Sequence, residues 1–241
     1  MSQPLNHLGQ PIGWPVRDWV PPPPPPRAPM RGHFCCVEPL DADHHAAELH
    51  AANQADAEGR MWTYLAYGPF ASLEAYRAWV EPMSASADPL CYAIVDGASG
   101  RALGVASYLR IAPDAGSIEI GHLAFAPALQ RSPVATEALF LLMERAFTLG
   151  YRRLEWKCDA LNEPSRAAAR RLGFSFEGIF RQATVYKGRN RDTAWYSVVD
   201  GEWPALQAAF RRWLDPANFD QHGRQRLRLS ALTRPLLYRE G

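Results

Sequence analysis

Long apolar runs are missing from this sequence: no stretch approaches the roughly 18 residues that a membrane-spanning helix needs. The first residues lack a basic start followed by an apolar stretch, so we expect no secretory signal. An excess of one charge is also missing, because 26 lysines and arginines face 25 aspartates and glutamates, a formal net charge of +1. This balance argues against a strongly basic nucleic-acid-binding protein and against a polybasic membrane-binding module. We therefore expect a cytoplasmic protein that binds neither nucleic acid nor membrane.

Cysteine is scarce and irregularly placed. The four cysteines are Cys35, Cys36, Cys91 and Cys158, and no Cys-x-x-Cys pair occurs. The pattern therefore predicts neither a disulfide framework nor a metal site, and reduced thiols in a cytoplasmic protein are the simplest interpretation. Phosphate loops of the types Gly-x-x-x-x-Gly-Lys-Ser/Thr and Gly-x-Gly-x-x-Gly are missing too, which argues against a nucleotide-binding protein of those kinds.

The 241 residues fit one large domain with extensions, long enough to bury a substantial core. Residues 1–32 contain glycine and proline at short intervals and include a run of six prolines. Such a run favours polyproline II, so we expect an extended arm. Trp14 and Trp19 favour an arm that lies over the domain, because large apolar rings are rarely left in water; a ligand for a polyproline-binding partner is the alternative. We expect the domain at residues 33–214 and a basic tail at residues 215–241.

From residue 33 onward, apolar residues recur at strand and helix spacing. The predicted strands are residues 33–39, 91–96, 102–111, 117–125, 153–158, 174–180, 184–186 and 193–199, and the predicted helices are residues 41–57, 72–81, 133–149, 162–172 and 203–214. A turn over residues 187–192 is expected between the last two strands. This order, an antiparallel meander followed by strand–helix–strand–helix and a closing hairpin, predicts an α+β fold.

The chemistry is expected where the strand at 117–125 runs through a short polar turn into the helix at 133–149. A helix N-terminus carries unpaired backbone N–H groups and a partial positive charge, which together suit a pyrophosphate. Arg131 adds a full charge, and the hydroxyls of Ser132 and Thr136 add donors. Taken alone, the segment could equally be a capped helix without a ligand.

This turn resembles the acetyl-CoA-binding motif of the GNAT superfamily, whose loop reads Gln/Arg-x-x-Gly-x-Gly/Ala. Residues 130–135 read Gln-Arg-Ser-Pro-Val-Ala, so Gln130 and Ala135 match the motif. Pro133 replaces the usual glycine and removes one possible phosphate donor, because proline has no backbone N–H. Proline is tolerated in the first turn of a helix, so the fold is compatible with it.

A second stretch resembles the RimJ/RimL-like branch of the same superfamily. Residues 162–165 read Asn-Glu-Pro-Ser and residues 171–174 read Arg-Leu-Gly-Phe, similar to that branch's Asn-x-x-Ser…Lys/Arg-x-Gly-Phe. The resemblance covers residues 33–199 and implies an acyl-CoA-dependent N-acyltransferase that moves an acetyl group from acetyl-CoA to a primary amine. Acceptors in that branch are protein N-termini, amino sugars, amino acids and other small amines. The alternative is a non-catalytic acyl-CoA-binding or scaffolding protein with the same fold.

The resemblance also implies a GNAT-like fold: a mixed, mostly antiparallel central sheet with helices on both faces. The strands at 117–125 and 153–158 would splay apart, and coenzyme A would enter the cleft between them. The residues implied to bind the cofactor are Leu123, Phe125, Gln130, Arg131, Ser132, Val134, Ala135, Thr136 and Asn162.

Direct attack of an amine on a thioester needs a base and a proton donor for the leaving thiolate. The resemblance implies Ser165 as that donor; a helix-capping serine is the alternative. We hypothesise Glu119 as the base, since a carboxylate between apolar neighbours near a cleft can have a raised pKa. A structural carboxylate paired with an arginine is the alternative. The RimJ/RimL-like branch can place a base later, where this chain has Thr184, which cannot serve; Tyr186 or a water chain could substitute.

Strand alternation predicts which face each residue of this strand occupies. It places Glu119 on one face with Gly121 and Leu123, opposite Ile118, Ile120 and His122. His122 is therefore expected on the buried opposite face and is the weaker candidate for the base.

An aromatic wall is expected around the amine acceptor. Trp62, Tyr64, Tyr67 and Phe70 lie between the first two helices, and Trp195 and Arg189 on the closing hairpin could face the same cleft. An aromatic-walled pocket suits a cationic amine, although these rings could instead belong to the core or to an interface. The extensions at both ends could contact a second copy of the chain, so a homodimer is a further expectation.

Overall fold

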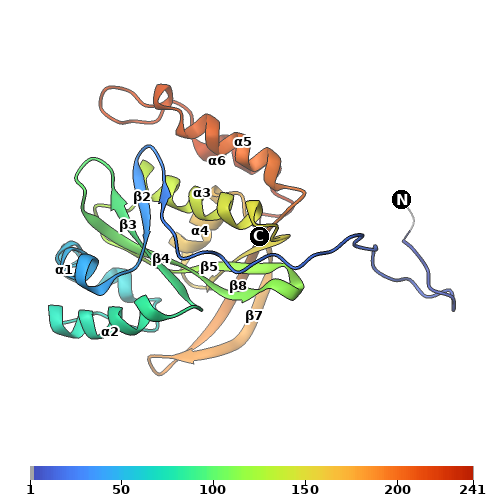
Figure 1. The fold of residues 1–241 in the computed structure, drawn as a ribbon, viewed down its shortest axis with the longest axis horizontal. Helices are drawn as coiled ribbons and strands as arrows, with labels where there is room; N and C mark the ends of the chain where they lie inside the picture. Colours follow the sequence, from blue (N-terminus) through green and yellow to red (C-terminus); the bar gives the residue numbers. More distant parts are fainter. Residues whose placement is uncertain (1–2, 241) are drawn as a thin grey trace.

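A computed structural model describes residues 3–240 as one eight-stranded sheet with helices on both faces (Figure 1). The strands are β1 (Met30–Arg31), β2 (Cys35–Pro39), β3 (Leu90–Asp96), β4 (Ala102–Ala112), β5 (Ser117–Phe125), β6 (Arg153–Asp159), β7 (Ser175–Tyr186) and β8 (Arg189–Val199). Their order across the sheet is β1-β2-β3-β4-β5-β6-β8-β7, and only the β5–β6 pair is parallel. The predicted α+β fold is confirmed.

Two apolar clusters cover the two faces of the sheet. The helices are α1 (Ala42–Asn53), α2 (Leu73–Ala85), α3 (Pro133–Thr148), α4 (Glu163–Arg171), α5 (Trp203–Leu214) and α6 (Leu229–Thr233), with short 3-10 turns η1 (Arg60–Trp62), η2 (Pro113–Ala115), η3 (Pro216–Asn218) and η4 (Arg234–Leu236). Helices α3 to α6 pack on one face and α1 and α2 on the other, as Figure 1 shows. No helix among residues 3–240 is long and apolar enough to cross a membrane.

The helix ends follow local signals in the sequence. Asp41 caps α1 by accepting hydrogen bonds from the backbone amides of residues 43 and 44, and Ser72 caps α2. Gly150 and Gly173 follow α3 and α4 with φ of 97° and 92°, values that side chains resist and that glycine adopts freely. The predicted helix starts and the two glycine stops are confirmed, whereas α1 ends at Asn53, before the expected residue 57, and α2 ends at Ala85, after the expected residue 81.

The closing hairpin differs from the prediction. The six-residue turn expected at 187–192 is only Lys187-Gly188, with φ of 48° and 69°, and β8 already begins at Arg189. The two strands expected at 174–180 and 184–186 are the single strand β7. Its pairing with β8 shifts register between Phe180 and Thr184, and such a bulge interrupts the alternation from which strands are recognised.

The N-terminal arm lies against the domain only in its second part. Pro22 and Pro25 are buried, three residues apart, as expected for one face of a polyproline II helix. Trp19 packs beside Gly116, whereas Trp14 is 56% exposed, and the chain before Trp19 extends away from the domain (Figure 1). The expectation that both tryptophans lie over the domain therefore holds for Trp19 only.

The start of β2 is held by a buried carboxylate from α3. Glu137 accepts hydrogen bonds from the backbone amides of His33, Phe34 and Cys35 at 2.8, 2.6 and 2.9 Å. Because these amides bond a side chain rather than a neighbouring strand, the strand expected from residue 33 begins at Cys35. Glu137 thus connects the segment between the arm and β2 to helix α3, which follows the predicted phosphate loop.

Candidate active site

The sheet opens between β5 and β6. The two strands pair only from Ser117↔Arg153 to Glu119↔Glu155. Beyond that point β5 continues beside β4, and β6 continues beside β8 along its whole length. The predicted splayed pair is therefore present, and the N-termini of α3 and α4 follow directly from the connections that leave its two strands.

At the predicted cofactor end, the turn before α3 is held in a fixed shape. The Ser132 hydroxyl donates to the Leu129 carbonyl at 2.6 Å and accepts from the Ala135 amide at 3.0 Å, so it caps α3. The Gln130 side chain closes the turn by donating to the Phe125 carbonyl at 2.8 Å. The turn is thus shaped by its own side chains before any ligand binds.

Backbone amides in this turn remain free. Arg131 has a left-handed φ of 59°. Within residues 3–240, the amides of Arg131, Ser132 and Val134 donate to no acceptor. Neighbouring free amides next to a left-handed residue form a concave site for anions, strengthened by the helix dipole. The residues present therefore fit a pyrophosphate even though Pro133 contributes no amide.

Thr136 has a more buried position than the other predicted loop residues. Its side chain is 3% exposed, and its hydroxyl donates to the Ser132 carbonyl at 3.2 Å. The Arg171 guanidinium donates to the same hydroxyl at 3.2 Å through both terminal nitrogens. Thr136 therefore joins α3 to α4, and its proton is already donated within the chain.

The N-terminus of α4 supplies a serine with a free proton. Asn162 caps the helix by accepting from the Ser165 backbone amide at 3.2 Å, so Ser165 is not the capping residue. The Ser165 hydroxyl accepts from the Trp156 indole N–H at 3.1 Å, which leaves its own proton available. Burial raises the pKa of the neighbouring Cys158 thiol, so this cysteine stays protonated.

At the predicted acceptor end, Glu119 is buried, and both of its cations bind the same oxygen. Its side chain is 4% exposed, and its Oε2 lies 2.9 Å from Arg110 and 2.9 Å from Lys157. Within residues 3–240, no group bonds Oε1. Burial raises the pKa of the Glu119 carboxyl, while Lys157 and Arg110 oppose that rise. Both interpretations of Glu119 therefore hold: its carboxylate pairs with an arginine, and it is also buried with one oxygen free.

His122 and Leu123 lie on the faces opposite to those predicted. Ser107 pairs with Gly121 and Val105 with Ala124, so β5 has one residue too many and bulges. His122 has φ of 50°, and its ring stacks on Tyr67 at 5.6 Å, with Nδ1 3.3 Å from the Tyr67 hydroxyl. Leu123 instead packs against the apolar cluster on the α3 side. A bulge inverts the alternation beyond it, which is why both predictions are wrong.

The predicted aromatic residues divide between the core and the site. Trp62 is buried in the cluster beneath α1 and α2, where Phe70 contacts it. Tyr67 stacks on His122, and the Tyr64 hydroxyl donates to the Leu161 carbonyl at 3.1 Å, next to the start of α4. Trp195 lies under the Lys157 ammonium, 3.8 Å from Nζ to the ring centroid. Tyr67 therefore lies beside β5, Tyr64 beside the start of α4, and Trp195 beside Lys157.

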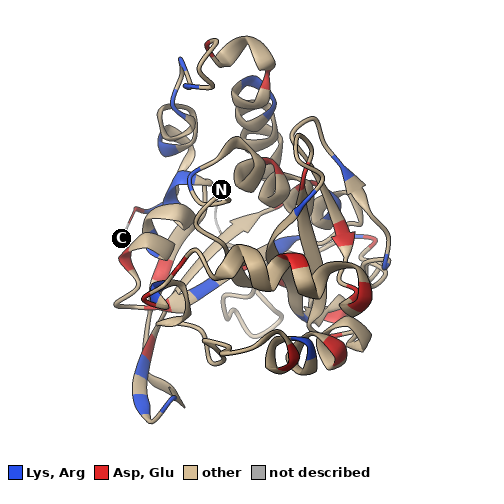
Figure 2. Cartoon of the chain, turned by 90° about the vertical axis from the view of Figure 1, so that its left-hand side faces the viewer, with Lys and Arg blue, Asp and Glu red and all other residues tan. Residues whose placement is uncertain are grey.

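The β7–β8 hairpin bridges this end from the other side. Lys187 donates to the Trp62 carbonyl at 2.8 Å, and Arg189 donates to the Thr63 carbonyl at 2.9 Å. In Figure 2 this hairpin projects from the domain with basic residues at its tip. The Tyr186 hydroxyl donates to the Asp159 carboxylate at 2.8 Å, and burial with this carboxylate raises the pKa of Tyr186 to about 12. Tyr186 therefore stays protonated and is a poor base at neutral pH.

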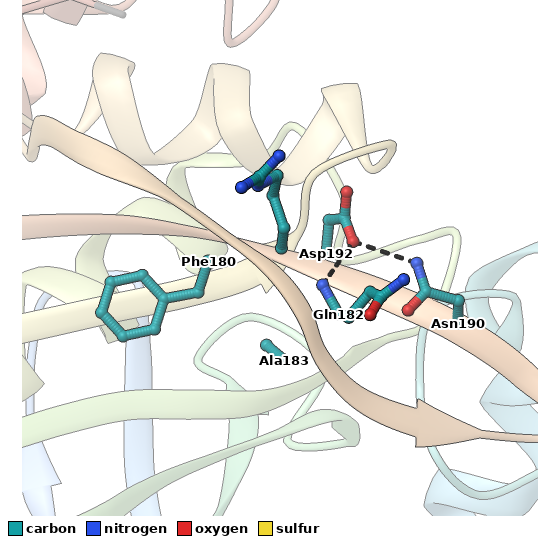
Figure 3. Close-up of a pocket in the computed structure, with 6 residues that line it drawn as sticks. Phe180, Gln182, Ala183, Asn190 and Asp192 are labelled. Atoms are coloured by element: carbon teal, nitrogen blue, oxygen red, sulfur yellow. Dashed lines mark hydrogen bonds between the residues drawn. The ribbon is translucent and has the colours of Figure 1, made fainter.

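A hollow of about 760 Å³ lies where β7 bends (Figure 3). Two of its lining residues are fixed by the Asp192 carboxylate, which accepts hydrogen bonds from the backbone N–H of Gln182 at 2.7 Å and from the side-chain amide of Asn190 at 3.0 Å. Gln182 has a left-handed φ of 50°. None of the predicted site residues lines this hollow. It lies at the bulge of β7, where the register with β8 shifts between Phe180 and Thr184.

Three residues of the site were not predicted from the sequence: Arg110, Lys157 and Lys187. Arg110 and Lys157 reach Glu119 from β4 and β6, and Lys187 reaches the η1 segment from the hairpin turn. Alternation along residues 153–159 could have placed Lys157 and Glu155 on one face. Only the order of the strands in the sheet brings that face beside Glu119.

Comparison with known proteins identifies the family. A model of the acetyltransferase (GNAT) domain matches residues 36–175. A GCN5-related N-acetyltransferase from Brucella melitensis is 46% identical, with 90% of this chain and 99% of that chain covered and a TM-score of 0.89. A GNAT-family protein from Chromobacterium violaceum ATCC 12472 is 44% identical, with 85% and 100% covered and a TM-score of 0.76.

A more distant structure shares the fold alone. The microcin C7 self-immunity acetyltransferase MccE, solved in complex with acetyl-CoA and AMP, is 21% identical, with 70% of this chain and 93% of that chain covered and a TM-score of 0.62. No curated protein matches the chain. Because the domain model matches more than half of the residues and the two bacterial structures cover most of the chain, this protein belongs to the GNAT superfamily of N-acetyltransferases and is of the RimJ/RimL-like kind.

Proposed function

We propose that this protein transfers an acetyl group from acetyl-CoA to a primary amine, on a small molecule or a protein N-terminus, with Glu119 as the base. The observation that carries the proposal is the free Oε1 of a buried Glu119 whose Oε2 is held by two cations. A base needs an unpartnered oxygen, a fixed orientation and a pKa above that of an exposed carboxyl. Glu119 combines the three.

The cofactor supplies an activated acyl group as a thioester when bound. The free amides of Arg131, Ser132 and Val134 and the Arg131 side chain are suited to hold its pyrophosphate. Leu123 and Phe125, at the open end of β5, and Asn162, at the start of α4, border the cleft where its arm would lie. This assignment accords with MccE, which shares the fold and binds acetyl-CoA.

Each catalytic role then falls to a side chain of this protein. Glu119 removes a proton from the acceptor ammonium at Oε1, which exposes the lone pair that attacks. Ser165 donates its free proton to the departing sulfur, while the Trp156 indole keeps the hydroxyl oriented. Tyr67 and Trp195 serve as rigid walls rather than as cation-binding faces, because Tyr67 already stacks on Trp79 and His122. The Trp195 ring is likewise covered by Phe180 and the Lys157 ammonium.

Glu119→Gln tests the proposal. The amide keeps the shape of the side chain but cannot accept a proton, so kcat should fall by about 10² or more on any amine that the wild type acetylates. Thiol release against a panel of amines, amino acids and N-terminal peptides measures kcat, and calorimetry with acetyl-CoA should show unchanged binding. Glu144→Gln is the matched control, since Glu144 pairs with Arg211 and not with the Glu119 cations. Near-wild-type turnover of Glu119→Gln would contradict the assignment.

A further inference from the structure

Lys157 is a buried cation with partners on three sides. Its side chain is 7% exposed, and Nζ lies 2.9 Å from Glu119 Oε2 and 2.6 Å from Glu155 Oε2. The Trp195 ring covers the third side at 3.8 Å. A compact ammonium with three donors suits two carboxylates and an aromatic face, where a planar guanidinium would need room for its fork.

Arg110 offers a comparison within the same site. It binds the same oxygen of Glu119 at the same 2.9 Å, but its side chain is 60% exposed against 7% for Lys157. Water screens the charge of an exposed side chain, so Arg110 lowers the pKa of Glu119 less than Lys157 does. The charge of Lys157 acts through the protein interior, where screening is weak.

We propose that Lys157 is a positioning residue of the reaction: it holds Oε2 of Glu119 so that Oε1 faces the acceptor, and it keeps that carboxylate ionised. The inference rests on the proposed function of Glu119 as the base. The other charged groups around Glu119 are Arg110 on β4 and Glu155 on β6. Arg153 and Glu177 act through Glu155, and Asp88 holds the backbone of Arg110.

The charges predict opposite effects for two substitutions. Burial raises the pKa of Glu119 and Lys157 lowers it, so Lys157→Met removes the main opposing charge and the pKa should rise. Glu155 raises the pKa of Glu119 and also shares the Lys157 ammonium. Glu155→Gln leaves that ammonium to Glu119, so the pKa should fall. If Lys157 and Glu155 merely supported the fold, these two substitutions would not shift the pKa of Glu119 in opposite directions.

The experiment measures the Glu119 carboxyl directly and through turnover. Carbon NMR of the glutamate carboxyl groups, titrated without acetyl-CoA, follows the pKa, with Glu119→Gln identifying the signal. The acid limb of kcat against pH follows the same group in the working enzyme. Lys157→Met should move the midpoint of the NMR titration and the acid limb of kcat to higher pH by about one pH unit or more. The value of kcat on the acid side should then be about tenfold lower. Arg110→Gln should move both by less, and Glu155→Gln should move both downward. Lys157→Arg keeps the charge but needs room for its fork, so it should restore the wild-type behaviour only in part.

The outcomes separate the two proposals. If Glu119→Gln is inactive and Lys157→Met leaves both the NMR titration and the acid limb in place, the role of Lys157 is wrong and that of Glu119 stands. If Glu119→Gln keeps its turnover, the base has been misassigned, whatever Lys157 does to the titration. Thermal unfolding checks each variant. Should Lys157→Met fail to fold, Glu155→Gln decides the matter, because an upward or absent shift there overturns the proposal.

Discussion

The two ends of the cleft present different chemical groups: mainly backbone amides at one end, and charged and aromatic side chains at the other. At the predicted cofactor end, the turn before α3 presents free backbone amides, and the side chains of Ser132 and Asn162 act mainly on the backbone. At the acceptor end, the buried pair Glu119–Lys157 and the rings of Tyr67 and Trp195 stand in place of backbone groups. Backbone amides tolerate substitution of the side chains around them, whereas a buried charge depends on each of its neighbours. Substitutions at the two ends should therefore have separable effects on cofactor binding and on turnover.

The largest effect outside Glu119 is expected at Ser165. Ser165→Ala removes the hydroxyl proton that the first turn of α4 supplies and should lower kcat by about 10², because proton donation to a leaving group contributes on that order. Calorimetry should show acetyl-CoA binding within about twofold of wild type, since the amides of the α3 turn are untouched.

Ser197→Ala is the matched control for this substitution. It also removes a buried serine hydroxyl, but one that bonds Glu177 on the strand pair β7–β8. Its kcat should stay close to that of the wild type. Full turnover in Ser165→Ala would mean that the thiolate is protonated by another group and that Ser165 serves only as the acceptor of the Trp156 indole.

Asn162→Ala should have a smaller effect of a different kind. Losing the cap of α4 should lower the free energy of unfolding by about 1 kcal/mol, and losing a polar contact to the cofactor should raise the Kd of acetyl-CoA about twofold to tenfold. Asp41→Ala removes an equivalent cap from α1, far along the chain from both cofactor helices. It should cost similar stability, measured by denaturant unfolding, and leave the Kd unchanged. Equal Kd changes in both variants would remove Asn162 from the cofactor site.

The same contrast explains what could be predicted from the sequence. Asp41 and Asn162 cap the helices predicted to begin there, and Ser132, predicted as a phosphate donor, also caps its helix. Such caps are readable because a cap and the amides it binds lie within three residues of each other. The longer strands and helices were also predicted by type, with errors at their ends, whereas the short elements β1 and α6 were not predicted, since periodicity is visible only over whole elements. The cofactor end is therefore largely readable from local pattern.

The acceptor end is not local. One extra residue in β5 reverses the faces of His122 and Leu123, and nothing in the sequence marks a bulge at that point. Lys157 meets Glu119 only because β5 and β6 pair in parallel, although the chain between these two strands passes through α3. Composition and spacing therefore identified the base candidate but not the cations that orient it.

The smallest expected effect is at the hairpin bridge. Lys187→Met removes a donor to the Trp62 carbonyl at an exposed position, so the segment from residue 60 to 64 should loosen only slightly. The acceptor KM should rise about twofold to fivefold, as expected for the loss of one such hydrogen bond, and the Kd of acetyl-CoA should not change. Hydrogen exchange should be faster at residues 60–64 and unaltered in α3 and α4. Arg181→Met is the control, because Arg181 lies on the same hairpin without a bond to that segment. If Lys187→Met instead weakened acetyl-CoA binding, the two ends would be coupled through the hairpin, and their separation would fail.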